Sequence, residues 1–398
     1  MADVPARGRG GVSVARKVLG VTGIRSDYDI MSSVFRAIAE HAQLSLELVV
    51  TGAHLSEAFG RTISMIRDDG FRIADEIESL VNGNSTSSRV KGLGIQLQGL
   101  VQTIVRVRPD FLIVLGDREE AMTTALAGAY LDVPTAHVAG GDRVVGNVDD
   151  QVRHAVTKLA HLHFVTNHES YQRVIGLGEQ AFRVHNTGNP GLDRLLTVPD
   201  LPAAALSKSL GFEIVEGAPL LLVIQHALSS EVSESYRQMR ETLEAVKALG
   251  LTTVLSYPNS DPGGQGLVDA IKEFESLPFL YTAKSIPRLE FVNLMRRASC
   301  LLGNSSAGIL EAPLLKLPVV NVGNRQLGRL HAGNVQFVGH DRHAIQPAVH
   351  RAVFDEDYRA SVRDCENPYG DGQSSRRIAE ILASIPIDRK LLIKDMTY

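Results

Sequence analysis

Short apolar runs alternate with longer amphipathic segments along the first half of the chain. Apolar runs at 17–23, 46–51, 111–115, 134–138 and 163–166 have the length of buried strands. The segments between them repeat apolar residues every three to four positions, which predicts helices. Strands and helices in alternation are typical of a parallel sheet with helices on both faces. The pattern therefore predicts an α/β domain, with a shorter third strand expected at 70–73.

The same pattern starts again after a Pro- and Ala-containing stretch at 198–204, which we interpret as a connector. The strands predicted in this half are 219–225, 252–256, 279–281, the apolar run before Gly303, and 318–321. Helical spacing returns between them, and a last helix is predicted at 374–384. We therefore expect two α/β halves, with a ligand cleft between them.

Charged residues follow the predicted strands of the first half, where open α/β sheets bind their ligands. These positions are Arg25 with Asp27, Asp117 with Arg118, the 139–150 loop, and Arg153 with His154. Asp117 follows five apolar residues and a glycine, so burial could raise its pKa towards that of a useful base. The alternative is that Asp117 caps the next helix or pairs with Arg118. For Asp149 and Asp150 the capping alternative is stronger, although one can cap while the other faces the cleft.

A stretch of small polar residues, 303–308, lies between a predicted strand and a helix that we expect to open at Ile309. The first amides of a helix lack partners inside it, and with the helix dipole they form a site for a phosphate. Ser305 and Ser306 add hydroxyl donors, and Glu311 lies where a carboxylate could accept from sugar hydroxyls. The alternative is an ordinary strand, turn and capped helix.

Other polar positions in the second half fit the same ligand. His226 ends an apolar strand and could donate to a phosphate, although a lone histidine is more often structural. Arg325 and Arg329 frame a glycine-containing turn, and arginine suits a diphosphate because it offers paired donors. Phe291 could stack on a nucleobase or lie in the core. Neither a P-loop nor a GxGxxG after the first strand is present, so a nicotinamide cofactor is not indicated.

Composition narrows the class of protein. With 398 residues, 44% hydrophobic and 22% charged, the chain has the profile of a globular protein of two or three domains. A net charge of −4 gives no reason to expect a nucleic acid or a membrane as partner, and no apolar run is long enough to span a bilayer. Residues 1–13 lack the apolar core of a signal peptide and are predicted to be a frayed arm. Cys300 and Cys365 show no metal-ligand spacing, which favours free thiols in the cytoplasm and no metal.

In combination, the motifs over residues 17–385 resemble those of hydrolysing UDP-N-acetylglucosamine 2-epimerases, the branch that releases free N-acetylmannosamine and UDP. The matching motifs are TGIRSDYD (22–29), VTGAHLSEAFGRT (50–62), VLGDR (114–118), HVAGGD (137–142), DDQVRHAVTKLAHLHF (149–164), YPNSDPGG (257–264), GNSSAGILEAP (303–313), NVGNRQLGR (321–329) and NPYGDG (367–372). The resemblance implies a GT-B-like fold, with two Rossmann-type domains whose parallel sheets face each other across a cleft. The implied domains are 1–195 on the sugar side and 196–375 on the UDP side, with 376–398 crossing back to the first. It also implies a UDP-sugar substrate, no cofactor, and a homodimer.

The resemblance assigns roles to matching positions. The implied UDP contacts are Arg25, Ser305, Ser306 and Gly308 at the diphosphate, Glu311 at the ribose, Phe291 at the uracil, and His226, Asn259 and Arg325 along the nucleotide. Asp117 and Asp149 match the family's catalytic carboxylates. The implied reaction is anti elimination of UDP to a 2-acetamidoglycal, followed by addition of water with inversion at C2.

One motif departs from the family. The usual HxEGGE is His137-Val-Ala139-Gly-Gly-Asp142 here, so an alanine replaces a catalytic glutamate. Either Asp142, Asp149 or a water takes over its proton transfer, or the reaction stops at the glycal, becomes a simple UDP-sugar hydrolysis, or uses a different sugar. The remaining alternatives are a non-hydrolysing epimerase, a UDP-sugar-binding module and a GT-B glycosyltransferase. The 149–158 stretch favours the hydrolysing branch.

Overall fold

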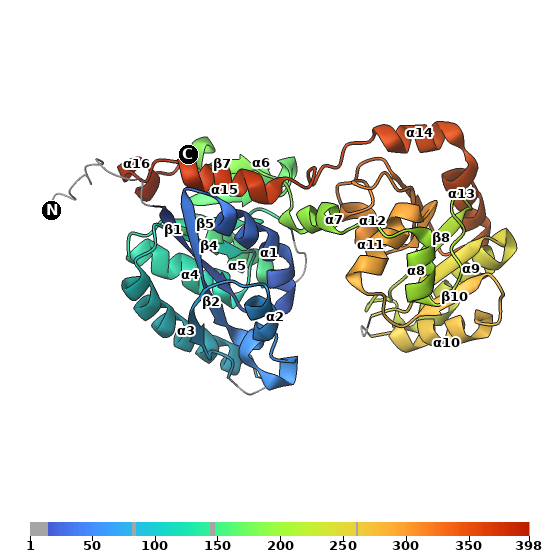
Figure 1. The fold of residues 1–398 in the computed structure, drawn as a ribbon, viewed down its shortest axis with the longest axis horizontal. Coiled ribbons are helices and arrows are strands. Elements are labelled where there is room, and N and C mark those ends of the chain that lie inside the picture. Colours follow the sequence, from blue (N-terminus) through green and yellow to red (C-terminus); the bar gives the residue numbers. More distant parts are fainter. Residues whose placement is uncertain (1–14, 82–84, 144–147, 260–261, 398) are drawn as a thin grey trace. The chain divides into compact units, whose positions relative to one another are not determined.

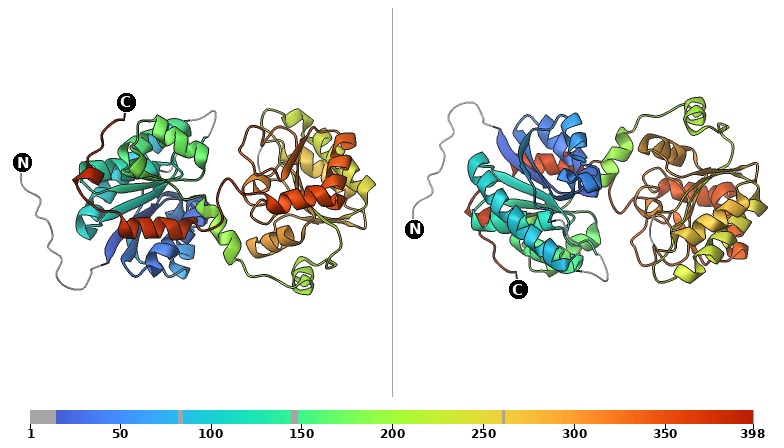
Figure 2. Two further views of the ribbon diagram at one scale, coloured as in Figure 1. Left: turned by 90° about the horizontal axis from the view of Figure 1, so that it is seen from above. Right: turned by 90° about the horizontal axis from the view of Figure 1, so that it is seen from below.

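The computed structural model describes residues 15–81, 85–143, 148–259 and 262–397. The predicted arm at 1–13, Gly83 and Asn84 of a predicted loop, and the pair 260–261 of the YPNSDPGG motif lie outside the described residues. The chain forms two compact units (Figures 1 and 2). Unit 1 comprises the residues up to Asp193 together with those from Gly372 onward, and unit 2 comprises Arg194–Asp371.

A seven-stranded sheet in the order β3-β2-β1-β4-β5-β6-β7 forms the centre of unit 1, and all of its strand pairs are parallel. The strands are β1 (Arg16–Thr22), β2 (Leu44–Thr51), β3 (Ile73–Ile77), β4 (Phe111–Leu115), β5 (Thr135–Val138), β6 (Leu162–Val165) and β7 (Val184–Asn186). The strand order reverses between β1 and β4, which are paired, so the carboxyl ends of these two strands lie side by side. In sheets of this kind, ligands bind at such a reversal.

Neighbouring residues along β1 serve two separate cores, because side chains alternate between the faces of a strand. Val18 packs with α1 and α15, whereas Leu19 packs with α3 and α4. The helices of unit 1 are α1 (Arg25–Glu40), α2 (Ile63–Asp68), α3 (Thr86–Val107), α4 (Glu119–Tyr130), α5 (Asp149–Leu159), α6 (His168–Gly176), α15 (Ser374–Ser384) and α16 (Arg389–Leu392). Helix α15 lies beside α1, although the two are far apart in sequence (Figure 1).

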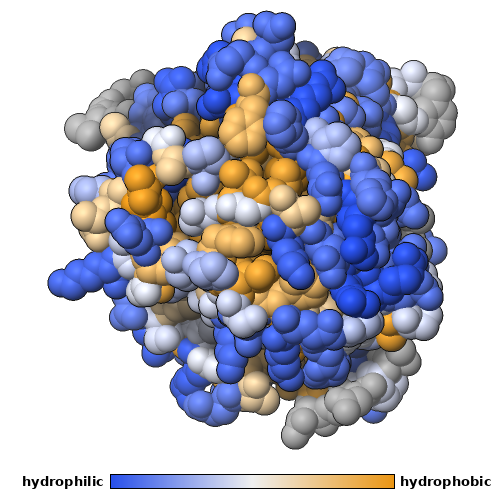
Figure 3. All heavy atoms as spheres, turned by 90° about the vertical axis from the view of Figure 1, so that its right-hand side faces the viewer, coloured by the Kyte–Doolittle hydropathy of each residue, from blue (hydrophilic) through white to orange (hydrophobic). Residues whose placement is uncertain are grey.

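Unit 2 repeats this architecture with six parallel strands in the order β10-β9-β8-β11-β12-β13. The strands are β8 (Leu220–Ile224), β9 (Thr252–Ser256), β10 (Leu280–Ala283), β11 (Cys300–Gly303), β12 (Val319–Val322) and β13 (Val335–Val338). Helices α9 (Ser235–Leu249), α10 (Gly264–Phe274), α13 (Arg342–Phe354) and α14 (Glu356–Asp364) cover one face. Helices α7 (Asp193–Thr197), α8 (Ala203–Leu210), α11 (Arg288–Arg297) and α12 (Ala307–Leu310) supply the core on the other. The end of the molecule viewed in Figure 3 is largely hydrophilic around a central hydrophobic band.

Most predicted elements are confirmed, and three predictions are corrected. The third strand is Ile73–Ile77 and not 70–73, and the connector 198–204 already contains the start of α8. The helix expected to open at Ile309 is only the four-residue α12, followed by turns. Pro313 explains this, because proline lacks an amide hydrogen and disfavours helical backbone in the residue before it. Among the described residues, no helix is long and apolar enough to cross a membrane.

Candidate functional site

The residues predicted to carry the chemistry in unit 1 follow β1, β4 and β5. Arg25 is the first residue of α1, and its Nε lies 3.6 Å from an Asp29 carboxylate oxygen. Asp117 follows β4 and forms an ion pair with Arg153 of α5, in which both side chains are largely buried. The alternative that Asp117 pairs with Arg118 is therefore wrong. Arg118 instead faces Glu119 and Glu120, at 3.7 and 3.6 Å.

Two buried acids accompany these residues: Asp27, one of the predicted strand-end charges, and Glu120, which was not predicted. Asp27 is 7% exposed and accepts a hydrogen bond from the Gly23 amide, at 3.4 Å. Burial, reinforced by the nearby Glu120 carboxylate, raises the pKa of Asp27 to about 7. Burial also raises the pKa of Glu120, which is 5% exposed. No sequence signal marked Glu120, because its burial depends on the Gly23 and Gly52 backbones that pack against it.

His137 organises the ends of β4 and β5. Burial lowers its pKa to about 3, so the ring is neutral at physiological pH. Its Nε2 lies 2.7 Å from the Gly116 carbonyl and must donate, and its Nδ1 lies 3.3 Å from the Thr157 hydroxyl, which donates to the Arg153 carbonyl at 3.0 Å. The histidine therefore fixes the turn that carries Asp117 against α5, which carries Arg153.

The 139–150 loop holds the remaining candidates. Asp142 accepts hydrogen bonds from the hydroxyls of Thr166 at 2.5 Å and Ser170 at 2.7 Å, and burial raises its pKa. Asp149 is the first residue of α5 and is half-buried. Ala139 has a φ of 61°, a left-handed conformation that costs a residue with a Cβ about 1–2 kcal/mol. The backbone at this one position is thus held in a conformation that alanine does not favour.

Asn304, which is 1% exposed, connects three neighbouring strand ends of unit 2. Its side chain accepts from the His226 amide at 2.7 Å and donates to the His226 carbonyl at 2.9 Å. Its own carbonyl accepts from Arg325 Nη1 at 3.1 Å and from Gln326 Nε2 at 2.9 Å. One asparagine therefore brings together the residues that follow β8, β11 and β12. The sequence placed Asn304 in a motif but did not indicate this role.

His226 and Asn259 meet beyond β8 and β9. The Asn259 amide donates to His226 Nδ1 at 3.2 Å. In a neutral imidazole the other nitrogen then carries the hydrogen, so Nε2 is the donor. In this tautomer, His226 presents the Nε2 hydrogen that a phosphate or hydroxyl oxygen would accept.

The loop after β11 is shaped by its glycines. Gly303 has a φ of 128°, and a Cβ there would collide with the Ile224 carbonyl. The Gly308 amide is bonded to the Ser305 carbonyl at 3.1 Å, and a Cβ on Gly308 would lie 2.9 Å from Val319. Gly308 therefore serves packing. Within the described part of the chain, no acceptor is recorded for the amides of Ser305 and Ser306, and both residues are partly exposed.

Glu311 and Phe291 share a neighbour that was not predicted. Arg288 forms an ion pair with Glu311 at 2.7 Å, and its guanidinium lies 5.8 Å from the centre of the Phe291 ring. Phe291 is partly buried against the core, so the stacking and the core interpretations both fit it. The Glu311 carboxylate is therefore neutralised by Arg288.

Known proteins resemble this chain in sequence and in fold. The family profile described as UDP-N-acetylglucosamine 2-epimerase matches residues 36–383. The UDP-N,N'-diacetylbacillosamine 2-epimerase (hydrolyzing) of Legionella pneumophila is 34% identical over 96% of this chain and 100% of its own. The GDP/UDP-N,N'-diacetylbacillosamine 2-epimerase (hydrolyzing) of Campylobacter jejuni is 30% identical over 80% and 83%.

A solved structure agrees with these relatives on the fold. The UDP-GlcNAc 2-epimerase of Neisseria meningitidis, bound to UDP-GlcNAc, superposes with a TM-score of 0.75 at 20% identity, over 92% of this chain and 99% of that one. Each unit has the parallel-sheet α/β architecture that the sequence predicted, and the chain shares the GT-B-like fold of this structure. With its strand-end carboxylates in unit 1 and its asparagine-centred loop in unit 2, this chain belongs to the UDP-N-acetylglucosamine 2-epimerase family.

Proposed function

We propose that this protein is a hydrolysing 2-epimerase that releases UDP and a free C2-inverted sugar from a UDP-2-acetamido sugar. The observation that carries the proposal is the coexistence of an intact nucleotide loop around Asn304 with the buried Asp117–Arg153 pair. The naming of the Legionella and Campylobacter relatives as hydrolysing enzymes supports the same reading.

In this proposal, unit 2 binds the nucleotide. Ser305, Ser306 and Arg325 donate to the diphosphate, and His226 donates through Nε2. Positive and N–H groups at that position stabilise the charge on the departing UDP, which is the largest electrostatic demand of the reaction. Glu311 binds the ribose, and Phe291 and Asn259 lie along the uridine. Arg25 would contribute a further cation to the diphosphate from unit 1.

The carboxylates of unit 1 serve the proton transfers. A carboxylate removes the C2 proton while the C1–O bond to UDP breaks, which leaves the 2-acetamidoglycal and UDP. Water then adds at C1, and a proton returns to C2 on the opposite face, so C2 is inverted. Asp117, Asp149 and Asp142 are the groups proposed for these two transfers. Burial raises the pKa of Asp142 above that of an ordinary aspartate, which favours its protonated form.

Ala139 affects which sugar the protein can accept as substrate. A methyl group replaces the family's glutamate and transfers no proton, so the neighbouring carboxylates or a water must do so. The smaller side chain also leaves more room beside β5 for a substituted sugar. We propose either a 2,4-diacetamido-6-deoxy sugar or GlcNAc as the glycosyl group, in a cytoplasmic homodimer.

The test is NMR spectroscopy of the purified protein with each UDP-sugar in deuterated water. We expect UDP and a free sugar that is inverted at C2 and carries deuterium there. A deuterated UDP-sugar epimer would instead indicate the non-hydrolysing reaction. A persistent glycal, or an uninverted free sugar, would mean that Ala139 has redirected the chemistry. Saturable binding without turnover of either sugar would identify a binding module.

A further inference from the structure

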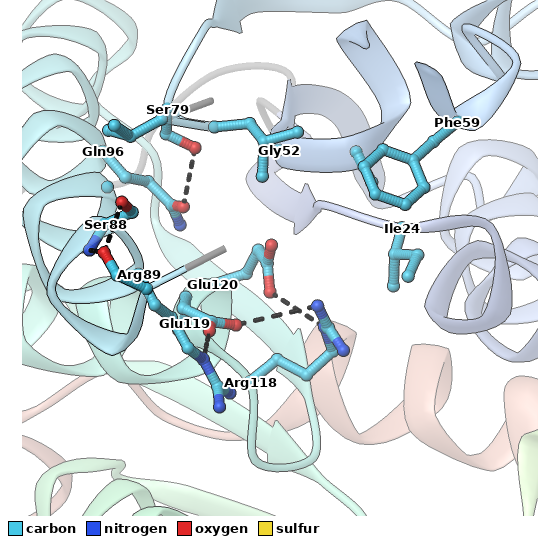
Figure 4. A pocket seen from close by; sticks show the side chains of 15 residues that line it. Ile24, Gly52, Phe59, Ser79, Ser88, Arg89, Gln96, Arg118, Glu119 and Glu120 are labelled. Atoms are coloured by element: carbon cyan, nitrogen blue, oxygen red, sulfur yellow. Dashed lines mark hydrogen bonds and ion pairs between the residues drawn. The ribbon is translucent and has the colours of Figure 1, made fainter. Parts of the chain in front are cut away.

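A pocket of about 440 Å³ opens in unit 1, and Arg118, Glu119 and Glu120 line one part of it (Figure 4). It lies beyond the carboxyl ends of β1 to β4, against the first turns of α3. Ile24 and Phe59 form one side, and Ser88 and Gln96 form the other (Figure 4). Its size is within the range of pockets that hold small molecules.

The pocket has an apolar rim in spite of facing solvent. Phe59 is 61% exposed and Leu80 is 50% exposed, and both line it. Large apolar side chains that gather at the mouth of a pocket, and not singly over a surface, indicate a binding site.

Glu120 and Arg118 form its polar end. Glu120 is 5% exposed, and its Oε2 has no hydrogen-bond partner among the described residues. The Nε of Arg118 is likewise without one, and the two atoms are 3.6 Å apart, too far for a good hydrogen bond. The buried acceptor Glu120 Oε2 and the buried donor Arg118 Nε are therefore neighbours, and each can form one further hydrogen bond.

We propose that this pocket receives an acylamino group of the UDP-sugar, with Glu120 at the amide N–H, Arg118 at the carbonyl oxygen and Phe59 against the acyl methyl. A secondary amide fits because it carries a donor and an acceptor side by side with an apolar cap. Two arginines and two glutamates line the pocket, Arg89, Arg118, Glu119 and Glu120. Their charges balance, which favours a neutral group over a phosphate.

The site selects the acylamino group at C4. None of the carboxylates proposed for the proton transfers, Asp117, Asp142 and Asp149, is among the described residues that line the pocket. A substituent away from the reacting C2 carbon suits that place. This inference rests on the proposed function, and it makes a UDP-2,4-diacetamido-2,4,6-trideoxyhexose the preferred substrate over UDP-GlcNAc, which has a hydroxyl at C4.

The experiment compares these two UDP-sugars on the full-length protein and on the Phe59→Ser and Glu120→Gln variants. The exposure of Phe59 means that its replacement leaves the fold intact, and circular dichroism checks this for both variants. Tyr130→Ser is the matched control, because Tyr130 is an aromatic residue of unit 1 that is 84% exposed and does not line the pocket. Both kcat/KM and the Kd from titration calorimetry are measured.

We expect the wild type to favour the diacetamido sugar by at least about 10-fold, the scale on which such contacts discriminate substrates. Each pocket variant should lower that ratio by about 10-fold through the diacetamido sugar alone, and Tyr130→Ser should keep it. An equal preference in the wild type, or a ratio unchanged in both pocket variants, overturns the inference even if epimerisation proceeds. Absence of C2 inversion defeats the proposed function instead, and the Kd ratio then still decides on the pocket.

Discussion

At the scale of single residues, the partners of the charged groups decide what each can do. The carboxylate of Asp117 faces Arg153 and not the adjacent Arg118, and Arg118 faces Glu119 and Glu120. Asp117 and Arg118 are adjacent in sequence, but their side chains lie in two different environments. One is the ion pair proposed for catalysis, and the other is the polar end of the pocket.

We expect Asp117→Asn to lower turnover by at least about 100-fold while the Kd for UDP stays near that of the wild type. The amide keeps the shape of the side chain but cannot take a proton. Steady-state kinetics and calorimetry with UDP measure the two effects. Asp132→Asn, in an exposed position of the same unit, is the control. A parallel loss of UDP binding and turnover would assign Asp117 to binding.

The pKa of Asp27 leads to a pH dependence of stability. Its pKa is about 7 in the folded protein against 3.8 ordinarily, so between these values the native state holds a proton that the unfolded state has lost. The free energy of unfolding from this group therefore falls as the pH rises from about 4 to about 7. Asp27→Asn should remove that part of the dependence, as measured by urea unfolding at pH 5 and pH 8. Asp68→Asn, at an exposed site, should keep it, and an identical pH dependence in wild type and Asp27→Asn would contradict the assignment.

At the scale of elements, the loop after β11, which we propose binds the nucleotide, depends on one buried residue more than on a helix. Helix α12 has four residues, so its dipole is small, and the polar groups are positioned instead by Asn304 across β8, β11 and β12. The sequence correctly indicated a strand, small residues and a helix in this order, although α12 begins at Ala307 and not at Ile309. It missed where the helix ends, because that depends on a proline whose effect competes with the apolar spacing around it.

Asn304→Ala is expected to weaken UDP binding by about 10- to 100-fold, since it leaves the amide and the carbonyl of His226 without these partners, at about 1–3 kcal/mol each. Calorimetry with UDP measures the change. Asn324→Ala removes the same side chain from an exposed position in the adjoining turn and should have little effect. An unchanged Kd in a folded Asn304→Ala protein would show that the loop keeps its shape without this residue.

At the scale of the whole molecule, the chain closes unit 1 with its last residues. Arg183 is fully buried and donates to the carbonyls of Lys390, Leu391 and Ile393. Lys394 donates to three carbonyls at the end of α5 and pairs with Glu179 at 2.8 Å. The terminal segment is therefore bonded into the domain that begins the chain.

Lys394→Met should lower the free energy of unfolding by about 2–4 kcal/mol, because a largely buried pair loses one partner. Hydrogen exchange should rise around α5, β6 and α16 and stay unchanged in unit 2. The comparison is Lys390→Met, which removes an exposed ammonium that lies over the Phe182 ring and should cost about 1 kcal/mol or less. Equal effects of the two substitutions would mean that the Lys394 contacts contribute little.

The sequence by itself determined the kind of most main elements, the two α/β halves and the family, although it did not predict β13, α13 and α14. Apolar spacing and strand-end glycines are local properties, and a local pattern is sufficient to specify a strand or a helix. The motifs around Asp117 and Asn304 were likewise readable, because their residues are contiguous.

Only the tertiary structure decided which distant groups meet. Arg153 reaches Asp117, Arg288 reaches Glu311, and Glu120 is buried against Gly23 and Gly52, because the sheet orders place non-consecutive strands side by side. Burial and pairing set the charge and the hydrogen-bonding capacity of each group, and neither is a property of the residue type alone.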